Sequence, residues 1–279
     1  MGKDFSGRRP PARYMDPYHN RDEAEVPSDD RDDDRGGAIE GRNAVIEALR
    51  AGTKIDKVYI AKGDVDRTLG HIASAAREAG AVVSHVDRRK LDAMSVTHSH
   101  QGVIALTVLK DYVAISDILA LAQGRGEPAL IIVCDEISDP HNLGAIIRTA
   151  EAAGAHGVII PKRRSAGVTG VVAKTSAGAA MHMAVARVAN ITAALKELKD
   201  AGVWIYGAAA DGTAGIWQTD LTGAAAFVVG SEGTGMSRLV RENCDFLVNI
   251  PMCGKMSSLN ASVSAAILMY EAVRQRGLR

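Results

Sequence analysis

Apolar residues follow two alternating patterns from position 128 to the end of the chain. Short continuous apolar runs alternate with longer segments in which apolar residues recur at helical spacing. Continuous runs are typical of strands buried on both faces of a parallel sheet, and the longer segments are typical of the helices that cover it. The pattern therefore predicts an α/β domain with a mainly parallel sheet. Strands are predicted at 129–134, 157–160, 184–188, 203–208, 225–229 and 245–250, and helices at 142–153, 169–179, 192–201, 236–242 and 258–276.

A smaller α/β unit precedes this domain. Strands are predicted there at 57–61, 82–86 and 102–109, and helices at 44–51, 69–79 and 88–94. A partly helical connection over 111–126 ends in the helix-breaking sequence Gly124-Arg125-Gly126. After residues 1–37, the sequence therefore predicts a domain over 38–112, a linker over 113–127 and a larger domain over 128–279.

The first 37 residues have a different composition. They contain 7 Lys or Arg, 10 Asp or Glu and almost no aliphatic residues. Such a segment cannot bury enough apolar surface to offset its ordering entropy, so we expect a disordered acidic tail over 1–37. The remaining residues, 38–279, carry 26 Lys or Arg against 23 Asp or Glu. This small positive excess permits a nucleic-acid partner without requiring one.

The composition narrows the class of protein further. No apolar run reaches the ~18 residues of a membrane-spanning helix, and the N-terminus is charged, so we expect a cytoplasmic protein without a secretory signal or a membrane partner. The three cysteines are isolated, which indicates neither a disulfide framework nor a zinc site. His98 and His100 lack a third metal ligand at a fitting spacing, so we interpret them as part of a polar surface loop and expect no metal.

The predicted helix over 258–276 carries apolar residues on two faces. Val263 and Tyr270 belong to one face, and Ala265 and Leu268 belong to the other. A helix that is apolar on two faces buries both of them, so the pattern indicates an interface.

Three loops that follow predicted strands carry candidate functional residues. The first, 135–141, leads into a helix that contains Arg148, and Asn142 is a good N-cap for that helix. Arg148 either extends its charge to the surface or recognises a phosphate or substrate. The second loop, 230–235, has three glycines in six residues, which indicates a close approach of its backbone to a ligand.

The second loop lacks the marks of a phosphate site. Its spacing is Gly-x-x-Gly-x-Gly, which differs from the dinucleotide fingerprint, and no Walker lysine follows. Glu232 within it would repel a phosphate, so a neutral or cationic ligand suits it better. The third loop, 251–257, contains Gly254 and precedes a helix that we expect Ser257 or Ser258 to open. Together the loops predict a glycine-lined ligand site at the carboxyl ends of the strands.

These loops resemble the three motifs of the SpoU/TrmH family of RNA ribose 2′-O-methyltransferases, within the SPOUT superfamily. Their order and separations match those of the family, and the resemblance extends from Ile39 to the C-terminus. Segments 41–45 and 99–103 are similar to the family's N-terminal RNA-binding domain. The motif residues are Asp139-Pro140-His141-Asn142-Leu143-Gly144-Ala145 and Arg148; Val229-Gly230-Ser231-Glu232-Gly233 and Gly235-Met236; and Ile250-Pro251-Met252, Gly254, Ser257-Ser258-Leu259-Asn260 and Ser262-Val263.

The resemblance implies a fold and partners that the residue pattern alone does not. It implies an L30e-like RNA-binding domain over 38–112, followed by a SPOUT domain whose chain forms a deep trefoil knot and binds S-adenosylmethionine. It also implies a homodimer with the active site at the interface, which agrees with the two apolar faces of the last helix. Cofactor contacts are implied at Gly230, Ile250 and Leu259.

The resemblance further implies a catalytic set and a reaction. The set is Asn142, Arg148, Glu232, Ser258 and Asn260, and the reaction transfers a methyl group to the 2′-hydroxyl of a guanosine in 23S rRNA, either folded or within a ribosome-assembly intermediate. The family's proposed base is the arginine that matches Arg148. Because the pKa of a guanidinium exceeds ~12, we expect Arg148 instead to bind the adjacent phosphate and to stabilise the developing alkoxide. The other four residues would orient Arg148, the ribose or the glycine-rich loop.

Two alternatives stay open. The same chemistry could act on tRNA or on an antibiotic-sensitive rRNA site. The chain could also be a non-catalytic rRNA-binding factor in ribosome assembly.

Overall fold

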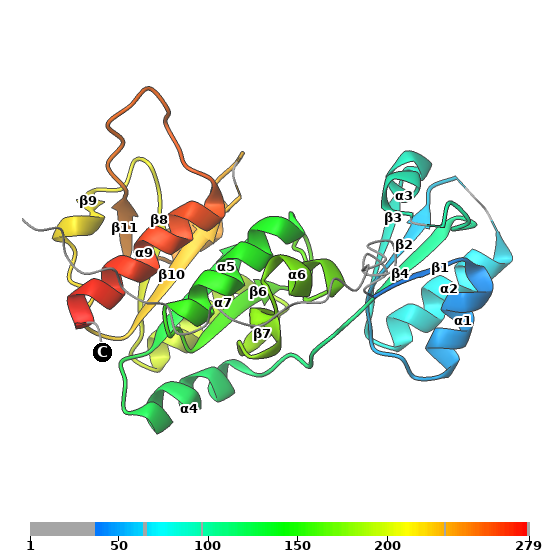
Figure 1. The fold of residues 1–279 in the computed structure, drawn as a ribbon, viewed down its shortest axis with the longest axis horizontal. Helices are drawn as coiled ribbons and strands as arrows, with labels where there is room; N and C mark the ends of the chain where they lie inside the picture. Colours follow the sequence, from blue (N-terminus) through cyan, green and yellow to red (C-terminus); the bar gives the residue numbers. More distant parts are fainter. Residues whose placement is uncertain (1–36, 64–65, 96, 232, 278–279) are drawn as a thin grey trace, which may run out of the picture. The chain divides into compact units, whose positions relative to one another are not determined.

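The structure is a computed structural model that describes residues 37–63, 66–95, 97–231 and 233–277. The predicted acidic tail lies outside these residues, apart from Gly37. Within the described ranges, no helix is long and apolar enough to cross a membrane. Two sheets organise this part of the chain (Figure 1).

A four-stranded sheet forms the N-terminal part of the described chain. It consists of β1 (Ala38–Glu40), β2 (Ile55–Ala61), β3 (Val82–Val86) and β4 (Val103–Thr107), with helices α1 (Arg42–Arg50), α2 (Arg67–Glu78) and α3 (Arg88–Met94). The strand order is β1-β4-β2-β3; β4 pairs antiparallel with β1 and β2, and β2 pairs parallel with β3. Val45, Val58 and Ile72 are fully buried in the core between this sheet and its helices.

A seven-stranded sheet forms the C-terminal part, and every pair of neighbouring strands in it is parallel. Its strands are β5 (Leu130–Asp135), β6 (Gly157–Pro161), β7 (Val185–Val188), β8 (Trp204–Ala208), β9 (Ala214–Gly215), β10 (Ala225–Gly230) and β11 (Phe246–Asn249), in the order β7-β6-β5-β10-β8-β11-β9. Its helices are α4 (Ile115–Arg125), α5 (Pro140–Ala152), α6 (Gly170–Thr175), α7 (Ile191–Asp200), α8 (Arg238–Glu242) and α9 (Ala261–Arg276). The predicted parallel α/β fold is confirmed.

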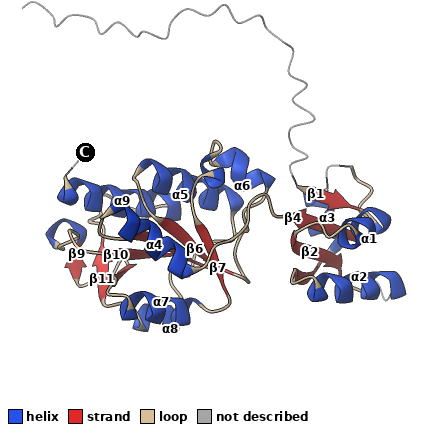
Figure 2. Ribbon diagram, turned by 90° about the horizontal axis from the view of Figure 1, so that it is seen from below, coloured by secondary structure: helices blue, strands red, loops and turns tan. Residues whose placement is uncertain are grey.

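Helices cover both faces of this sheet (Figure 2). α5, α6 and α9 lie on one face, and α7 and α8 lie on the other. The side chains of β10 alternate accordingly, because Phe227 and Val229 join the first core and Ala226 and Val228 join the second. All six residues of β5 are buried. These central strands therefore bury both faces, as the continuous apolar runs predicted.

Each predicted strand is present, with ends that differ by at most two residues. β1 and β9 were not predicted, since strands of three and two residues are too short to display a pattern. The helix predicted over 169–179 is shorter than expected and ends at Thr175. Ala177 and Gly178 follow with φ angles of +51° and +84°, and this left-handed backbone cannot continue a right-handed helix.

The structure also corrects the starts of two helices near the predicted site. α9 begins at Ala261 rather than at Ser257 or Ser258, because Asn260 caps it by accepting hydrogen bonds from the N–H groups of Ser262 and Val263 at 2.8 and 3.4 Å. α5 begins at Pro140, and its N-cap is Asp139, whose carboxylate accepts from the His141 N–H at 3.0 Å. Asn142 therefore lies within the first turn of α5, which frees its side chain from a capping role.

Only one of the two apolar faces of α9 is buried within the chain. Ala265 and Leu268 are fully buried against the sheet. On the other face, Val263 and Tyr270 keep 45% and 47% of their surface exposed. The prediction that both faces are buried is therefore not met by a single copy of this chain.

A buried histidine gives the fold a measurable dependence on pH. His156 is 2% exposed; its Nδ1 accepts a hydrogen bond from the Leu130 N–H at 3.0 Å, and its Nε2 lies 3.2 Å from the Glu127 carboxylate. Burial lowers the pKa of His156, the charges of Arg125 and Arg276 lower it further, and Glu127 opposes the shift. The folded protein therefore binds a proton at this position less readily than the unfolded chain.

This shift predicts acid destabilisation. An unfolded histidine takes up a proton as the pH falls below ~6.5, whereas folded His156 stays neutral to a lower pH. The free energy of unfolding should therefore fall below pH 6.5 by at most about 1.4 kcal/mol per pH unit through this group. Denaturant titrations at pH 7.0 and 5.5 should show a smaller loss for His156→Gln than for the wild type. Equal losses in the two proteins would contradict this account.

Candidate active site

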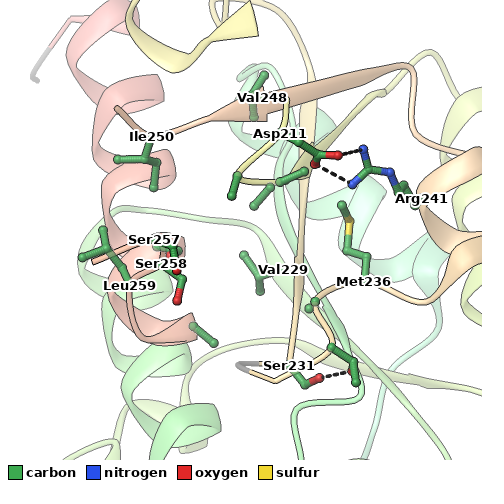
Figure 3. Close-up of a pocket in the computed structure, with 18 of the residues that line it drawn as sticks. Asp211, Val229, Ser231, Met236, Arg241, Val248, Ile250, Ser257, Ser258 and Leu259 are labelled. Carbon is green, nitrogen blue, oxygen red and sulfur yellow. Dashed lines mark hydrogen bonds and ion pairs between the residues drawn. The ribbon is translucent and has the colours of Figure 1, made fainter. Parts of the chain in front are cut away.

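A cavity of about 440 Å³ opens at the carboxyl ends of β8, β10 and β11 (Figure 3). These strands are neighbours in the sheet, so the segments that follow them converge. The walls are formed by residues within 208–211, 229–231, 233–236, 248–252, 257–259 and 261–264, together with Arg241 of α8. The volume falls within the range of ~300–1,000 Å³ that is typical of small-molecule sites.

The glycine-rich segment after β10 turns back sharply on itself. The N–H and C=O groups of Ser231 and Gly235 exchange hydrogen bonds of 3.2 and 2.8 Å, and Gly235 has a φ of +67°. At Gly230, a Cβ atom would lie 2.1 Å from the carbonyl carbon of Gly235 and 2.2 Å from the Met236 nitrogen. Only glycine allows this approach. Glu232 of the predicted set lies outside the described residues.

A buried carboxylate secures the far end of this segment. Asp135 ends β5, is 4% exposed and pairs in register with Gly230. Its Oδ2 accepts a hydrogen bond from the Ser237 N–H at 2.6 Å, at the N-cap of α8. The glycine-rich segment is thus held at its start by β10 and at its end by β5.

The segment after β8 was not identified from the sequence. Ala208, Ala209 and Ala210 line the cavity, and Asp211 beside them forms a two-pronged ion pair with Arg241, with both N–O distances 2.9 Å (Figure 3). Hydrogen bonds from Arg241 lower the pKa of the Asp211 carboxyl. Ala208 ends β8 and two further alanines follow it, a run of small residues that allows close approach but carries no chemistry of its own.

The third wall contains several predicted residues. Ile250, Ser258 and Leu259 line the cavity opposite Val229 (Figure 3), and Gly230 lines it as well. The structure therefore brings together all three predicted cofactor contacts, Gly230, Ile250 and Leu259, with Ser258 of the predicted catalytic set.

Asn142 and Asn260 meet outside the cavity lining. The Asn260 Nδ2 donates a hydrogen bond of 2.8 Å to the Asn142 Oδ1, although the two residues are 118 positions apart. The Oδ1 of Asn260 is occupied by the cap of α9, so the whole amide is fixed in orientation. This contact joins the first and third predicted loops.

Arg148 does not join these residues. It is exposed on α5, does not line the cavity and forms no hydrogen bond or ion pair within the described chain. It lies six positions after Asn142 on α5, which places the two side chains about 120° apart around the helix axis. A single copy of the chain therefore does not direct Arg148 toward its own cavity.

The cavity has the chemistry of a nucleoside site rather than a polyphosphate site. Val229, Val248 and Leu259 give it apolar walls, and the hydroxyl groups of serines and a threonine supply hydrogen bonds. Arg241 is paired with Asp211, and the described lining residues include no other cationic group to attract phosphates. Within the described residues, no group of three or more His, Cys, Asp or Glu side chains could hold a metal ion.

A parallel sheet with such a pocket at its strand ends defines an α/β domain that binds a nucleoside-containing ligand. Residues 129–270 match the model of the SpoU rRNA Methylase family. Residues 38–113 match the model described as RNA 2′-O ribose methyltransferase substrate binding. The chain therefore belongs to the SpoU methylase family, with a substrate-binding domain that precedes the catalytic one.

Relatives in two organisms share most of the chain. A Bacillus subtilis protein described as a TrmH family tRNA/rRNA methyltransferase, YacO, is 45% identical over 236 residues, which cover 85% of this chain and 94% of that protein. An uncharacterized tRNA/rRNA methyltransferase of Mycolicibacterium vanbaalenii is 48% identical over 237 residues, which cover 85% of this chain and 76% of that protein.

Two solved structures are similar. The AdoMet-bound rRNA methyltransferase from Sinorhizobium meliloti has a TM-score of 0.54 and 25% identity over 88% of this chain and 89% of its own. The SpoU methyltransferase AviRb from Streptomyces viridochromogenes, in complex with AdoMet, has a TM-score of 0.55 and 24% identity over 86% of this chain and 90% of its own. At that identity, the likeness to AviRb concerns the fold alone.

The chain is accordingly an S-adenosylmethionine-dependent RNA 2′-O-ribose methyltransferase, and the prediction of this cofactor is confirmed. The described cavity fits the cofactor. Its apolar walls suit an adenine ring, its hydroxyl groups suit a ribose, and its neutral ion pair leaves no net charge to repel a sulfonium.

The contact at Gly230 predicts a sharp effect on cofactor binding. Gly230→Ala forces a methyl group into the backbone of Gly235 and Met236, so the glycine-rich segment must move. Overpacking of this kind costs ~1–3 kcal/mol, so we expect the dissociation constant for S-adenosylmethionine to rise roughly 5- to 150-fold in titration calorimetry. Gly223→Ala is the matched control, because its added methyl group meets no atom within 4 Å. Wild-type affinity in Gly230→Ala would refute the role of this contact.

Proposed function

We propose that this chain methylates the ribose 2′-hydroxyl of a guanosine in 23S rRNA, and that it does so as a homodimer. The supporting observation is the convergence of Gly230, Ile250, Ser258 and Leu259 around one cavity, with the Asn142–Asn260 hydrogen bond beside it. The target is part of this proposal and follows from our interpretation of the motifs, which resemble those of RlmB, the 23S rRNA guanosine-2′-O-methyltransferase.

The cofactor supplies a methyl group on a positively charged sulfur, which an RNA hydroxyl can attack in line. In our proposal, Gly230, Ile250 and Leu259 hold it, mainly through backbone groups and apolar contacts. Ser258 extends its hydroxyl into the same cavity and orients the ribose. Alignment of this kind supplies much of the acceleration when neither reactant needs covalent activation.

The asparagine pair and Arg148 would act on the RNA side. The fixed Asn142 and Asn260 amides present polar groups to the ribose without the freedom of exposed side chains. The Arg148 guanidinium stays charged near neutral pH, so it serves as a phosphate ligand and an electrostatic stabiliser of the developing alkoxide, not as a base. In this scheme, the proton leaves late in the reaction or passes to a neighbouring group. The predicted role of Glu232, which is to fix the glycine-rich loop or the arginine, belongs to the same proposal.

A homodimer explains two features of the single chain, namely the exposed apolar face of α9 and the position of Arg148 outside the cavity. Val263 and Tyr270 on α9 are large and apolar, and they keep 45% and 47% of their surface exposed, while Ala265 and Leu268 on the opposite face are fully buried. Arg148 is exposed and does not line the cavity of its own chain. A second copy packed against α9 and α5 would cover the first pair and allow Arg148 of one copy to serve the cavity of the other.

The domain division is part of this proposal. We assign 38–112 to an L30e-like domain that selects the RNA, 113–127 to a linker and 128–279 to the SPOUT domain with its trefoil knot. The matched ranges 38–113 and 129–270 support this division.

The proposal predicts the product of one assay. Purified protein, radiolabelled S-adenosylmethionine and total RNA from cells that lack this gene should give label in 23S rRNA, recovered after digestion as 2′-O-methylguanosine. Label in small RNA would replace the 23S target with tRNA. Bound cofactor without label, even on isolated ribosome-assembly intermediates, would favour the non-catalytic assembly factor instead.

Arg148→Lys tests the assigned catalytic role. Lysine keeps the charge but loses the planar, two-pronged geometry that binds a phosphate. We expect the methyl-transfer rate at saturating RNA to fall roughly 100-fold, as for other groups that stabilise an oxyanion, while cofactor affinity is unchanged. Arg125→Lys on α4 controls for the loss of an exposed arginine. Near-normal turnover of Arg148→Lys would show that the planar geometry is unimportant.

A further inference from the structure

Three consecutive cationic residues follow β6, and the proposed chemistry does not use them. Lys162, Arg163 and Arg164 are all exposed. Arg164 pairs with Glu136 at 3.0 Å. Lys162 and Arg163 have no side-chain hydrogen bond or ion pair in the part of the chain that the structure describes. Their two positive charges are therefore directed to solvent without compensation.

The sheet register places this basic segment at the same, carboxyl ends of the strands as the cofactor cavity. Val133 of β5 pairs with Ile159 of β6, so Asp135, two residues further on, is level with Pro161. Asp135 is also the register partner of Gly230. Neighbouring strands are ~4.8 Å apart, and β6 is two strands away from β10. Lys162 therefore follows β6 at a point roughly 10 Å across the sheet from the cavity wall. This separation is short enough for one strand of RNA to contact both the cavity and these long side chains.

The backbone beneath the two free cations is firmly held. The Lys162 N–H donates to the Val188 carbonyl at 2.7 Å, and the Lys162 carbonyl accepts from Arg187 at 3.2 Å. Further along, the Ser165 hydroxyl and the Ala166 N–H both donate to the Ile137 carbonyl, at 3.0 and 2.9 Å. The segment is thus tied to β7 on one side and to the loop after β5 on the other.

The Arg164–Glu136 ion pair adds to this constraint. Both residues have left-handed backbones, with φ angles of +57° and +59°, which non-glycine residues seldom adopt. The ion pair joins the loops after β6 and β5 where both turn. Arg164 therefore helps to shape the segment, whereas Lys162 and Arg163 remain available for a ligand.

We propose that Lys162 and Arg163 bind the phosphate backbone of the substrate RNA beside the methylated nucleotide. This inference rests on the proposed function, since it requires an RNA strand at the cavity. A phosphate suits both residues: arginine binds its oxygens through two parallel hydrogen bonds, and lysine attracts it as a compact charge. Such contacts position the strand without reading its sequence. They increase affinity for any RNA that reaches this edge, while selection of the nucleotide is left to other groups.

The test is the salt dependence of RNA binding. Each phosphate contact releases a counterion, so its loss lowers the slope of log Kd against log salt concentration by about 1. With full-length protein and a 23S rRNA transcript, we expect the slope of Lys162→Gln/Arg163→Gln to be lower by about 2. A single-stranded oligouridine should show a decrease of the same sign, because the contacts do not read sequence.

Kinetics separate a positioning role from a structural one. The double variant should raise the KM for RNA about tenfold, with kcat at saturating RNA and the Kd for S-adenosylmethionine near wild-type values. The single variant Lys162→Arg keeps the charge at this position and leaves Arg163 intact. It should therefore keep most of the wild-type salt slope. The unfolding temperature should not change, since neither side chain has a partner to lose.

The control is a second double variant that loses the same net charge at positions outside the basic segment. Lys196→Gln/Arg125→Gln removes two exposed cations from α7 and α4, so an effect of overall charge alone would appear there equally. A wild-type salt slope and KM in Lys162→Gln/Arg163→Gln overturn the inference, even if the wild type methylates RNA. If the wild type binds RNA but does not methylate it, the proposed function fails, and the slope difference still tests this surface.

Discussion

The site depends on the close contact between Gly230 and the backbone of Gly235 and Met236. At this point β10, whose first five residues are buried, ends and the chain reverses within a few residues, so no side chain fits between the two segments. The hydrogen bond from Ser237 to the buried Asp135 holds the other end of the turn. Because the strands that bear these groups lie in the middle of a parallel sheet, the turn is positioned by the whole domain. The cavity is therefore a consequence of the core, with its walls completed by segments from the neighbouring strands.

Much of the fold could be predicted because the central strands are buried on both faces. Residues such as Ile132 in β5 and Val228 in β10 belong to continuous apolar runs, and that signal survives without knowledge of any partner. β9 left no such signal, because two residues cannot show a period. Helix starts were less predictable, because Ser257, Ser258 and Asn260 are all competent caps and tertiary packing decides among them. Asn260 is the residue that caps α9, and its side chain also donates a hydrogen bond to Asn142.

The sequence predicted which residues form the candidate site more readily than it predicted how those residues are arranged in space. The motif resemblance selected Gly230, Ile250 and Leu259, and these residues do share one cavity. It could not reveal that the loop after β8 forms another wall, since small alanines carry no chemistry of their own. Nor could it reveal the direction of Arg148. A motif records which residues occur together along a chain, whereas the phase of a helix determines which of them face the same space. Arg148, which follows Asn142 on α5, does not line the cavity of its own chain.

The strand order also bears on how the protein is made. β5 and β10 are neighbours in the finished sheet, yet paired residues such as Leu130 and Ala225 are 95 positions apart in the chain. At about 5–20 residues per second, synthesis of the intervening segment takes roughly 5–20 s. Throughout that interval, the edge of β5 that will receive β10 presents unpaired hydrogen-bonding groups beside an apolar surface, the condition in which strands join foreign chains. The central position that makes this strand a rigid support for the site therefore makes it, on the ribosome, the part of the nascent domain most in need of protection.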